Sequence, residues 1–329
     1  MMAKKLGVFF SGFGSQYVGA AKDIYDSSRV VQEYFEEAYN CLGINFVKLC
    51  FASSEEDLTH LDNAYLAVFL TDIAAWSLLG ELGVEPAVIA GLDAGMYSGL
   101  FVAGGFSFPD ALYLLNKYLG FYQEFLATNE LKLWRVTGLK QRVLNDLLGA
   151  VQANMEITVI NTHSDFLIGG SELEFEKLRK EVMTLMLDNN KIDYKEVPVA
   201  LGLNSSILAE PIANKFKIYL EKVDFKDLRF PVLNSVTGKA ILTGKVLKKD
   251  LVSQIIQPIN WPKIITGFQD CDLIIEVGAG KKLAALLQQV YPDKEILTLG
   301  SMADLVQVQV ALGLTNTFNI EDIYDSEPE

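Results

Sequence analysis

The stretch VIAGLDAGMYSGL, residues 88–100, has the pattern in which many enzymes present a reactive side chain. An apolar strand, a glycine, one polar residue, a second glycine and a helix hold the residue between the glycines in a sharp turn. Serine is common at that position, but this sequence has Asp93. A carboxylate there can act as a nucleophile, or it can cap the following helix without any catalysis. The identity of residue 93 therefore decides which chemistry this turn supports.

A second glycine-rich turn, FSGFGSQ at residues 10–16, follows a short apolar strand expected at residues 4–10. Two glycines two positions apart allow a tight turn before a helix, and dinucleotide-binding folds begin in a similar way. Tyr17 stands at the third glycine of that fingerprint, and no acidic residue ends a second strand about 20 residues later. The sequence therefore argues against dinucleotide binding.

Metal chemistry has few possible ligands in this chain. The three cysteines, Cys41, Cys50 and Cys271, are scattered, have no CxxC spacing and are expected to be buried reduced thiols. The two histidines, His60 and His163, are too few to complete a zinc site with them. We expect no metal and no other cofactor.

Charge and hydropathy narrow the class of partner. The 329 residues carry 28 lysines and arginines against 42 aspartates and glutamates, a net charge of −14 that opposes binding to nucleic acid or an anionic membrane. No apolar run reaches the roughly 18 residues that cross a bilayer, and the first residues do not form a signal peptide. We expect a globular, cytoplasmic protein with local basic patches at residues 245–250 and 280–282.

The elements expected to hold these turns alternate between strands and helices. Residues 86–91 have the apolar character of a parallel strand covered on both faces, and residues 272–280 are expected to form a further strand. Residues 62–83 are expected to form a helix that is apolar nearly all round. From about residue 129 the order becomes strand, helix, strand, strand, helix, strand, which is typical of a ferredoxin-like unit. The expected fold class is α/β, with a mostly parallel sheet and an α/β-hydrolase-like core.

This order predicts three parts of the chain. Residues 1–127 and 199–315 are expected to form one large, discontinuous α/β domain, and residues 128–198 are expected to form the inserted ferredoxin-like subdomain. The last residues, 316–329, are acidic and nearly free of core formers, which predicts a mobile tail.

Seven motifs, in order along the chain, resemble those of the malonyl-CoA:acyl carrier protein acyltransferases of fatty acid and polyketide synthesis. The two glycine turns, FSGFGSQ and GLDAGMYSG, are similar to the family patterns F-P-G-Q-G-S-Q and G-H-S-x-G-E-Y-S-A. The other matches are NTHSDFLIGG (161–170), LNSSIL (203–208), FPVLNSVTG (230–238), QPINW (257–261) and EVGAGKKL (276–283). The resemblance covers residues 5 to about 313 and implies the fold of that family.

The positions that react in this family are replaced here. By the resemblance, the nucleophilic serine of the elbow corresponds to Asp93, and the histidine that activates it corresponds to Asn204. The arginine that pairs with the malonate carboxylate corresponds to Tyr118, with Lys117 one residue away. Malonyl transfer by the family mechanism is therefore not expected.

The residues around the elbow are more apolar than their counterparts in the family. Leu92, Phe13 and Met96 stand where the family has histidine, glutamine and glutamate, so larger apolar side chains replace polar ones. The family builds its oxyanion hole from backbone N–H groups that correspond to Ala94 and Phe13. We expect Asp93 to cap the helix and block this hole. The former pocket is then either filled by side chains or open as an apolar pocket.

Three further residues belong to the candidate pocket. Asn161 matches an asparagine of the family, and Gly278 lies in the EVGAG turn. His163 lies two residues from Asn161, as a surface-turn histidine or a substitute base. Ser98 matches a serine that the family carries after the elbow, and we expect it to pack within the helix.

Three functions remain open at this point. The first is a catalytically degenerate homologue that binds or scaffolds an acyl carrier protein or a synthase component. The second is an acyltransferase or thioester hydrolase with a rebuilt site for acyl-CoA or carrier thioesters, and the third is a binder of an apolar, acyl-like ligand. Acyl carrier proteins are acidic, so their docking to this acidic chain requires local patches such as Lys281 and Lys282.

Overall fold

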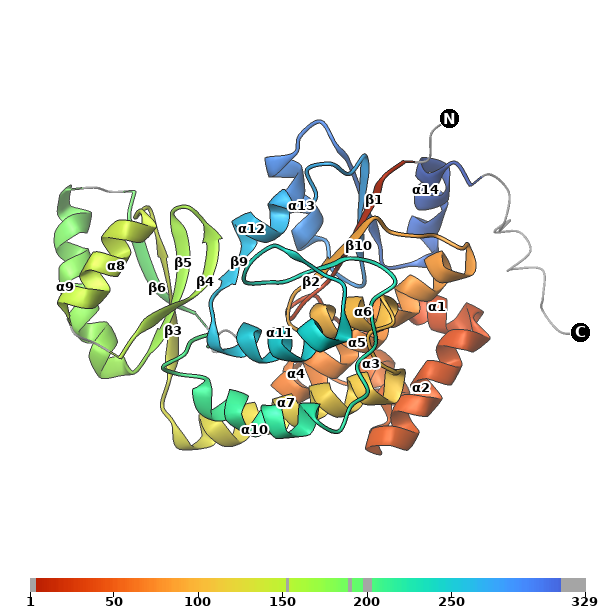
Figure 1. Cartoon of the computed structure of the whole chain (residues 1–329), viewed down its shortest axis with the longest axis horizontal. Helices are drawn as coiled ribbons and strands as arrows, with labels where there is room; N and C mark the ends of the chain where they lie inside the picture. Colours follow the sequence, from red (N-terminus) through yellow and green to blue (C-terminus); the bar gives the residue numbers. More distant parts are fainter. Residues whose placement is uncertain (1–3, 152–153, 189–190, 198–202, 315–329) are drawn as a thin grey trace, which may run out of the picture. The chain divides into compact units, whose positions relative to one another are not determined.

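The structure is a computed structural model that describes residues 4–151, 154–188, 191–197 and 203–314 (Figure 1). The chain divides into two compact units. Unit 1 comprises residues 1–115, 229–232 and 270–329, and unit 2 comprises residues 116–228 and 233–269. Unit 2 thus extends beyond the predicted insertion at 128–198. The predicted mobile tail, 316–329, lies outside the described residues.

A parallel sheet forms the centre of unit 1. Its strands run in the order β11 (Glu295–Leu299), β10 (Leu273–Val277), β1 (Leu6–Phe10) and β2 (Val88–Gly91), and Ile89 of β2 pairs with Val232 of β7 (Val232–Leu233). Every residue of β1, β2 and β10 is buried, as expected for parallel strands covered on both faces. The predicted α/β class with a parallel sheet is confirmed.

The helices of unit 1 include one that is apolar enough for a bilayer. They are α1 (Lys22–Ser27), α2 (Arg29–Leu42), α3 (Phe46–Ala52), α4 (Glu55–Thr59), α5 (Leu61–Glu81), α6 (Ala94–Val102), α13 (Lys282–Val290) and α14 (Met302–Leu312); α7 (Phe108–Thr128) begins in this unit and ends in unit 2. Contrary to expectation, α5 is long and apolar enough to cross a membrane by length and composition. Because 83% of its apolar window is buried inside the protein, α5 has the character of a core helix.

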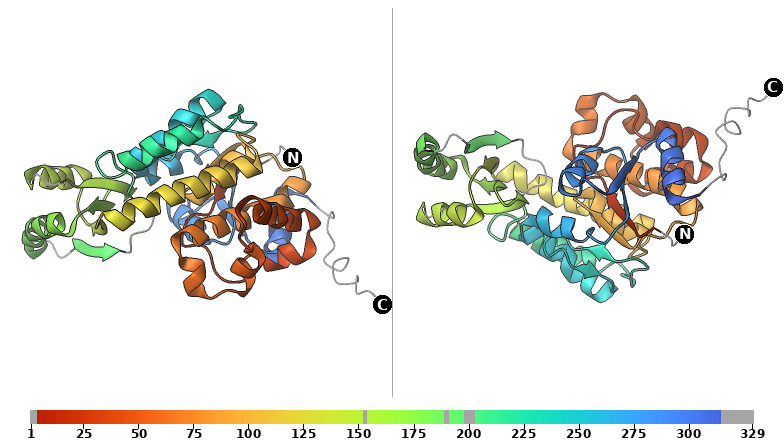
Figure 2. Two further views of the ribbon diagram at one scale, coloured as in Figure 1. Left: turned by 90° about the horizontal axis from the view of Figure 1, so that it is seen from below. Right: turned by 90° about the horizontal axis from the view of Figure 1, so that it is seen from above.

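An antiparallel sheet with two helices forms the ferredoxin-like part of unit 2. The elements follow in the order β3 (Lys132–Thr137), α8 (Gln141–Ala150), β4 (Glu156–Thr162), β5 (Asp165–Gly170), α9 (Glu172–Asp188) and β6 (Asp193–Val197). The strands lie in the order β6-β3-β5-β4, and β9 (Ile259–Asn260) adds a parallel edge beside β4. Figure 2 shows α8 and α9 side by side on one face of this sheet. The predicted ferredoxin-like order of elements is confirmed.

The interior of this sheet-and-helix layer is apolar and aromatic. Trp134 of β3 stacks on Tyr194 of β6 with ring centroids 4.5 Å apart, and Phe175 of α9 lies against the same indole at 5.0 Å. Unit 2 also contains α10 (Glu210–Leu220), β8 (Ala240–Ile241), α11 (Gly244–Ile256) and α12 (Trp261–Thr266). The last two of these helices flank β9 in the sequence.

Candidate functional site

The turn between β2 and α6 is a strand-to-helix elbow. Asp93 lies in it with φ 52° and ψ −118°, a left-handed backbone that costs roughly 1–3 kcal/mol in a residue other than glycine. A Cβ on Gly91 would clash with the carbonyl oxygen of Gly95, and a Cβ on Gly95 would clash with that of Ser11. Both glycines are therefore required for the turn, as the sequence predicts.

The carboxylate of Asp93 is partly exposed and has no hydrogen-bond partner among the described residues. A Cβ built on Gly12 would lie 3.6 Å from Asp93 Oδ2, which places this oxygen beside the first glycine turn. The prediction that Asp93 caps α6 is wrong. N-cap residues have an extended backbone that directs the side chain at the next N–H groups, whereas Asp93 has a positive φ. Burial raises the pKa of its carboxyl to about 7.

Two backbone N–H groups beside this carboxylate also lack partners in the described part of the chain. They belong to Ala94 and Phe13, the residues that correspond by resemblance to an oxyanion hole. Their neighbours are satisfied, because Gly95 N donates to Leu92 O at 2.8 Å and Gly14 N donates to Gln16 Oε1 at 2.8 Å. Within the described residues, neither N–H group donates a hydrogen bond to the Asp93 carboxylate, so this side chain does not occupy the two donors.

The apolar replacements next to the elbow are packed. Leu92 and Met96 are buried, with 8% and 3% of their surface exposed. Phe13 stacks on Tyr65 of α5 with ring centroids 5.3 Å apart. Burial of the Asp93 carboxyl at this elbow is the physical cause of its raised pKa.

A buried polar cluster lies on the inner side of α6. Asp72 of α5 has no exposed surface, and its two carboxylate oxygens accept hydrogen bonds from Ser11 Oγ at 2.7 Å and Ser98 Oγ at 2.8 Å. Ser15 Oγ donates to Gly12 O at 2.7 Å and lies 3.2 Å from Ser11 Oγ. Burial raises the pKa of Asp72 well above its usual range, and the two serine hydroxyls oppose this shift only in part.

The turn after β10 closes around the same cluster. Gly278 has φ +111°, and a Cβ there would overlap Asp72 Oδ1 and Ser11 Oγ. Glu276 of β10 accepts a hydrogen bond from Ala284 N at 2.7 Å, and its charge adds to the upward shift of the Asp72 pKa. Gly278 therefore lines the polar cluster beneath the elbow, where only glycine leaves room for Asp72.

Asn204 lies in unit 2, in a loop that is fixed by hydrogen bonds. Its Nδ2 donates to the carbonyl oxygen of Gln254 at 2.7 Å. Glu156 at the start of β4 accepts from Ser205 Oγ, from Ser206 Oγ at 3.1 Å and from Ile207 N at 3.2 Å. The segment that follows Asn204 is thus held by Glu156, and the amide of Asn204 is used for structure.

The other candidate residues of unit 2 have structural surroundings. Tyr118 of α7 packs against Phe216 of α10 with centroids 5.5 Å apart, as a packed aromatic residue does. Asn161 Nδ2 donates to Asp165 Oδ1 at 3.2 Å, and Asp165 forms a two-point ion pair with Arg135. His163 is exposed in the turn between β4 and β5, which fits a surface-turn histidine.

Comparison with known proteins decides the family. The family model for the acyl transferase domain matches residues 8–189, more than half of the chain, and this range contains both glycine turns. The chain belongs to the acyl transferase domain family. A malonyl CoA-acyl carrier protein transacylase of Bacillus subtilis (strain 168) is 29% identical over 292 residues, covering 87% of this chain and 90% of the relative. The resemblance drawn from the seven motifs is confirmed.

Solved structures show the same fold for this acyl transferase domain. The malonyl CoA-acyl carrier protein transacylase from Clostridium perfringens superposes with a TM-score of 0.85 at 26% identity, covering 94% of this chain and 97% of that one. A malonyl-transacylase in complex with a type II polyketide synthase acyl carrier protein superposes with a TM-score of 0.84 at 22% identity, over 93% and 99% of the two chains. The whole described chain thus follows the architecture of these transacylases.

The sequence did not predict the buried polar residues that support this acyl transferase elbow. Asp72 is a single acid within the apolar helix α5, and Ser11 stands where the family motif has proline. A lone carboxylate in an otherwise buried helix requires partners, and that signal was available. Glu156, which fixes the Asn204 loop, has no comparable signal because its partners lie about 50 residues away in the sequence.

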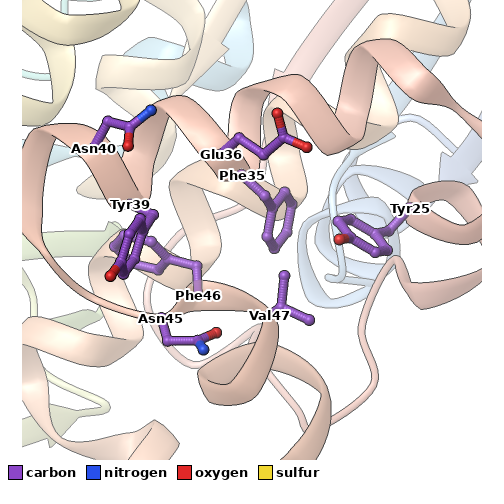
Figure 3. Close-up of a pocket in the computed structure, with 8 residues that line it drawn as sticks. All are labelled: Tyr25, Phe35, Glu36, Tyr39, Asn40, Asn45, Phe46 and Val47. Atoms are coloured by element: carbon purple, nitrogen blue, oxygen red, sulfur yellow. The ribbon is translucent and has the colours of Figure 1, made fainter.

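An aromatic pocket lies elsewhere on unit 1 (Figure 3). It has a volume of about 410 Å³ and includes none of the elbow residues. The lining comes from α1, α2 and α3 with the residue before α3: Tyr25, Phe35, Glu36, Tyr39, Asn40, Asn45, Phe46 and Val47. The pocket is thus separate in its residues from the former active site.

Proposed function

We propose that this acyl transferase homologue does not transfer malonyl groups through an acyl-enzyme, and that it acts as a binding or scaffolding partner in fatty acid or polyketide synthesis. The observation that carries the proposal is the elbow itself. It keeps the strained turn and the free N–H donors of Ala94 and Phe13, but it presents the carboxylate of Asp93. The fold for holding a thioester is retained while the covalent nucleophile is absent.

Chemistry opposes acyl transfer by Asp93. A carboxylate that attacked a thioester would form an acid anhydride, which lies uphill of the reactant. Asn204 has no titrating group with which to move a proton, and its amide is bonded to Gln254. In a well-studied hydrolytic triad, loss of the nucleophile or the base alone lowers the rate on the order of 10⁶-fold.

The arginine that pairs with the malonate carboxylate in the family is also replaced in this chain. Tyr118, which stands in for the arginine of the family, packs on Phe216 and carries no positive charge. An ionised Asp93 would repel the free carboxylate of a malonyl group at close range. Both differences support binding of a thioester other than malonyl, or of the carrier itself.

The partner we propose is an acyl carrier protein. The relatives of this chain are named for that carrier, and one structural neighbour is a complex with such a protein. Docking of an acidic carrier to a chain with net charge −14 requires a local basic patch. Lys281 and Lys282 are exposed at the start of α13, and Lys282 Nζ donates to Gly14 O at 3.1 Å beside the first glycine turn. We place this partnership in the cytoplasm, with no role for nucleic acid or membrane.

Two measurements test this proposal. Incubation with malonyl-CoA and holo acyl carrier protein, read by intact mass, is expected to show no malonyl adduct on the chain and no malonyl carrier, whereas the Bacillus subtilis transacylase gives both. Carrier binding, read by calorimetry, is expected to weaken in Lys281→Glu/Lys282→Glu and to persist in Lys48→Glu, a charge reversal on α3. Malonyl transfer by the wild-type chain, or absence of any carrier binding, would overturn the proposal.

A second candidate function is binding of an apolar ligand. The pocket in Figure 3 favours it, because Tyr25, Phe35 and Phe46 line a cavity of about 410 Å³ with mostly apolar side chains. Titration with a fluorescent fatty acid analogue would test it. Saturable binding that Val47→Asp abolishes supports this function, and a linear, unsaturable signal rejects it.

A further inference from the structure

The carboxylate of Asp93 differs from the other acids near the elbow because it has no partner. The two oxygens of Asp72 accept from Ser11 and Ser98, and Glu276 accepts from Ala284 N. No hydrogen bond or ion pair within the described ranges reaches the carboxylate of Asp93, and this side chain is partly exposed. A partly exposed carboxylate that has no hydrogen-bond partner in the protein is well placed to bind a water molecule.

We propose that the elbow hydrolyses acyl thioesters, with Asp93 as the general base that activates the attacking water. This activity goes beyond the binding role proposed above. It rests on that role in one respect, because an acyl thioester has to reach the elbow.

The step balances with water as the only co-reactant. The Asp93 carboxylate accepts a proton from water while the water oxygen forms a bond to the thioester carbonyl carbon. The carbonyl oxygen becomes an oxyanion, to which the N–H groups of Ala94 and Phe13 donate hydrogen bonds. The carbon–sulfur bond then breaks, and the proton passes from Asp93 to the departing thiolate. The products are a carboxylic acid and a free thiol, and Asp93 returns to its starting form.

This mechanism explains why the serine and histidine positions changed together. A serine nucleophile needs a separate base, whereas a carboxylate that activates water both accepts and returns the proton. Asn204 then has no proton to carry, and its amide is free to hold the loop through Gln254. The strained backbone at Asp93 remains useful, because it still directs the side chain of residue 93 out of the turn.

The environment also tunes the base. An ordinary aspartate, with a pKa of about 3.9, is a weak base at neutral pH. Burial raises the pKa of Asp93 to about 7, so near neutral pH a large share is deprotonated and the base is stronger.

The neighbouring side chains indicate the class of acyl group. The elbow and the first glycine turn carry the apolar side chains of Leu92, Met96 and Phe13, and the carboxylate of Asp93 repels a second negative charge. The expected substrates are therefore thioesters of uncharged acyl groups, such as acetyl or octanoyl, and malonyl thioesters are expected to react more slowly.

The test measures release of free coenzyme A by chromatography from acetyl-CoA, octanoyl-CoA and malonyl-CoA. The wild-type chain is expected to hydrolyse the uncharged thioesters with a rate that rises through a pH of about 7, and intact mass is expected to show no acyl adduct. Asp93→Asn is expected to lower kcat/KM about 100-fold or more. Asp293→Asn, which changes an exposed aspartate before β11, is expected to leave the rate unchanged.

Three outcomes would overturn the inference: release no faster than in buffer for all three thioesters, a wild-type rate in folded Asp93→Asn, or a covalent acyl adduct. Circular dichroism establishes that the Asp93→Asn variant is folded. If it is not folded, the pH profile of the wild-type chain is the test, and a hydrolysis rate that does not rise through a pH of about 7 overturns the inference. Silence in this assay with retained carrier binding rejects hydrolysis alone. Silence together with loss of carrier binding rejects the proposed function as well.

Discussion

Asp72 and Asp93 both lie near the start of α6, but the carboxylate of one is hydrogen-bonded and that of the other is not. Asp72 is fully buried, and each carboxylate oxygen accepts a hydrogen bond from a serine. Asp93 directly precedes α6 and is partly exposed, and its carboxylate has no partner within the residues described. Burial raises the pKa of both carboxyls. The same residue type thus serves as a structural link in one place and stays available in the other.

The difference shows what maintains the elbow when its reacting groups change. The turn is held by close-packed glycines and by the Asp72 cluster, which ties α5 and α6 to the first glycine turn. Among the described residues, the side chain of Asp93 makes no hydrogen bond to this frame, and its backbone oxygen accepts one from Met96 N at 3.2 Å. The residue at the tip can therefore vary without loss of the fold, and this is how a family member can keep its architecture with a different group at position 93.

The largest effect is expected from Gly278→Ala. The new Cβ would overlap Asp72 Oδ1 and Ser11 Oγ, and φ +111° is strained for alanine. We expect a loss of about 4 kcal/mol in the free energy of unfolding, measured by urea denaturation. The matched control is Gly313→Ala, where φ is +72° but no atom lies within 4 Å of the new Cβ, so only about 1 kcal/mol of backbone strain is expected. Equal losses in the two variants would contradict a tightly enclosed Asp72.

Replacement of the two aspartates by alanine compares them directly. Asp72→Ala leaves the hydroxyls of Ser11 and Ser98 buried without their acceptor, and we expect a loss of about 3 kcal/mol in unfolding free energy. Asp93→Ala removes no hydrogen bond, so we expect a change within about 1 kcal/mol. Thermal and urea unfolding of both variants provide the measurement. A larger loss from Asp93→Ala would show that its carboxylate has a structural partner.

The elbow was predictable from sequence because its causes are local. Two glycines flank residue 93 within five positions, and the steric demands that require them act between neighbouring residues and the adjacent strand β1. The parallel strands β1, β2 and β10 were predictable for the same reason, since each is a short, continuous apolar run.

The Asp72 cluster and the free Asp93 carboxylate depend on contacts that the local pattern does not contain. Asp72 lies 61 residues from Ser11 and 26 residues from Ser98, so their meeting is a consequence of the fold. The capping prediction for Asp93 failed because it assumed the extended backbone of an ordinary N-cap, whereas the elbow gives this residue a φ of 52°. A polar residue in an elbow is directed by the turn, and its sequence position alone does not show this.

The pH dependence of the unfolding free energy distinguishes the carboxylate of Asp93, with its raised pKa, from that of a fully exposed aspartate. The folded pKa of Asp93, about 7, lies above the value of about 3.9 for an unfolded aspartate, so the folded state binds more protons between these values. Its contribution to stability is therefore present at pH 4 and is lost as the pH rises through 7. We expect Asp93→Asn to raise the unfolding free energy by about 1–2 kcal/mol at pH 8 and hardly at pH 4, because partial exposure screens the full shift. Urea denaturation at both pH values measures this, and Asp293→Asn is the control; a gain of equal size at both pH values would contradict a raised pKa.

The smallest effect concerns the backbone of Asp93 alone. At φ 52° a residue with a Cβ is strained, and glycine adopts this conformation readily. We expect Asp93→Gly to be more stable than Asp93→Ala by about 1 kcal/mol in urea denaturation. At the exposed helical position Asp146 of α8 the order is expected to reverse, because glycine weakens a helix by about 1 kcal/mol relative to alanine. If alanine were the more stable replacement at both positions, residue 93 would not be strained in solution, and the elbow would lose the feature that directs its side chain out of the turn.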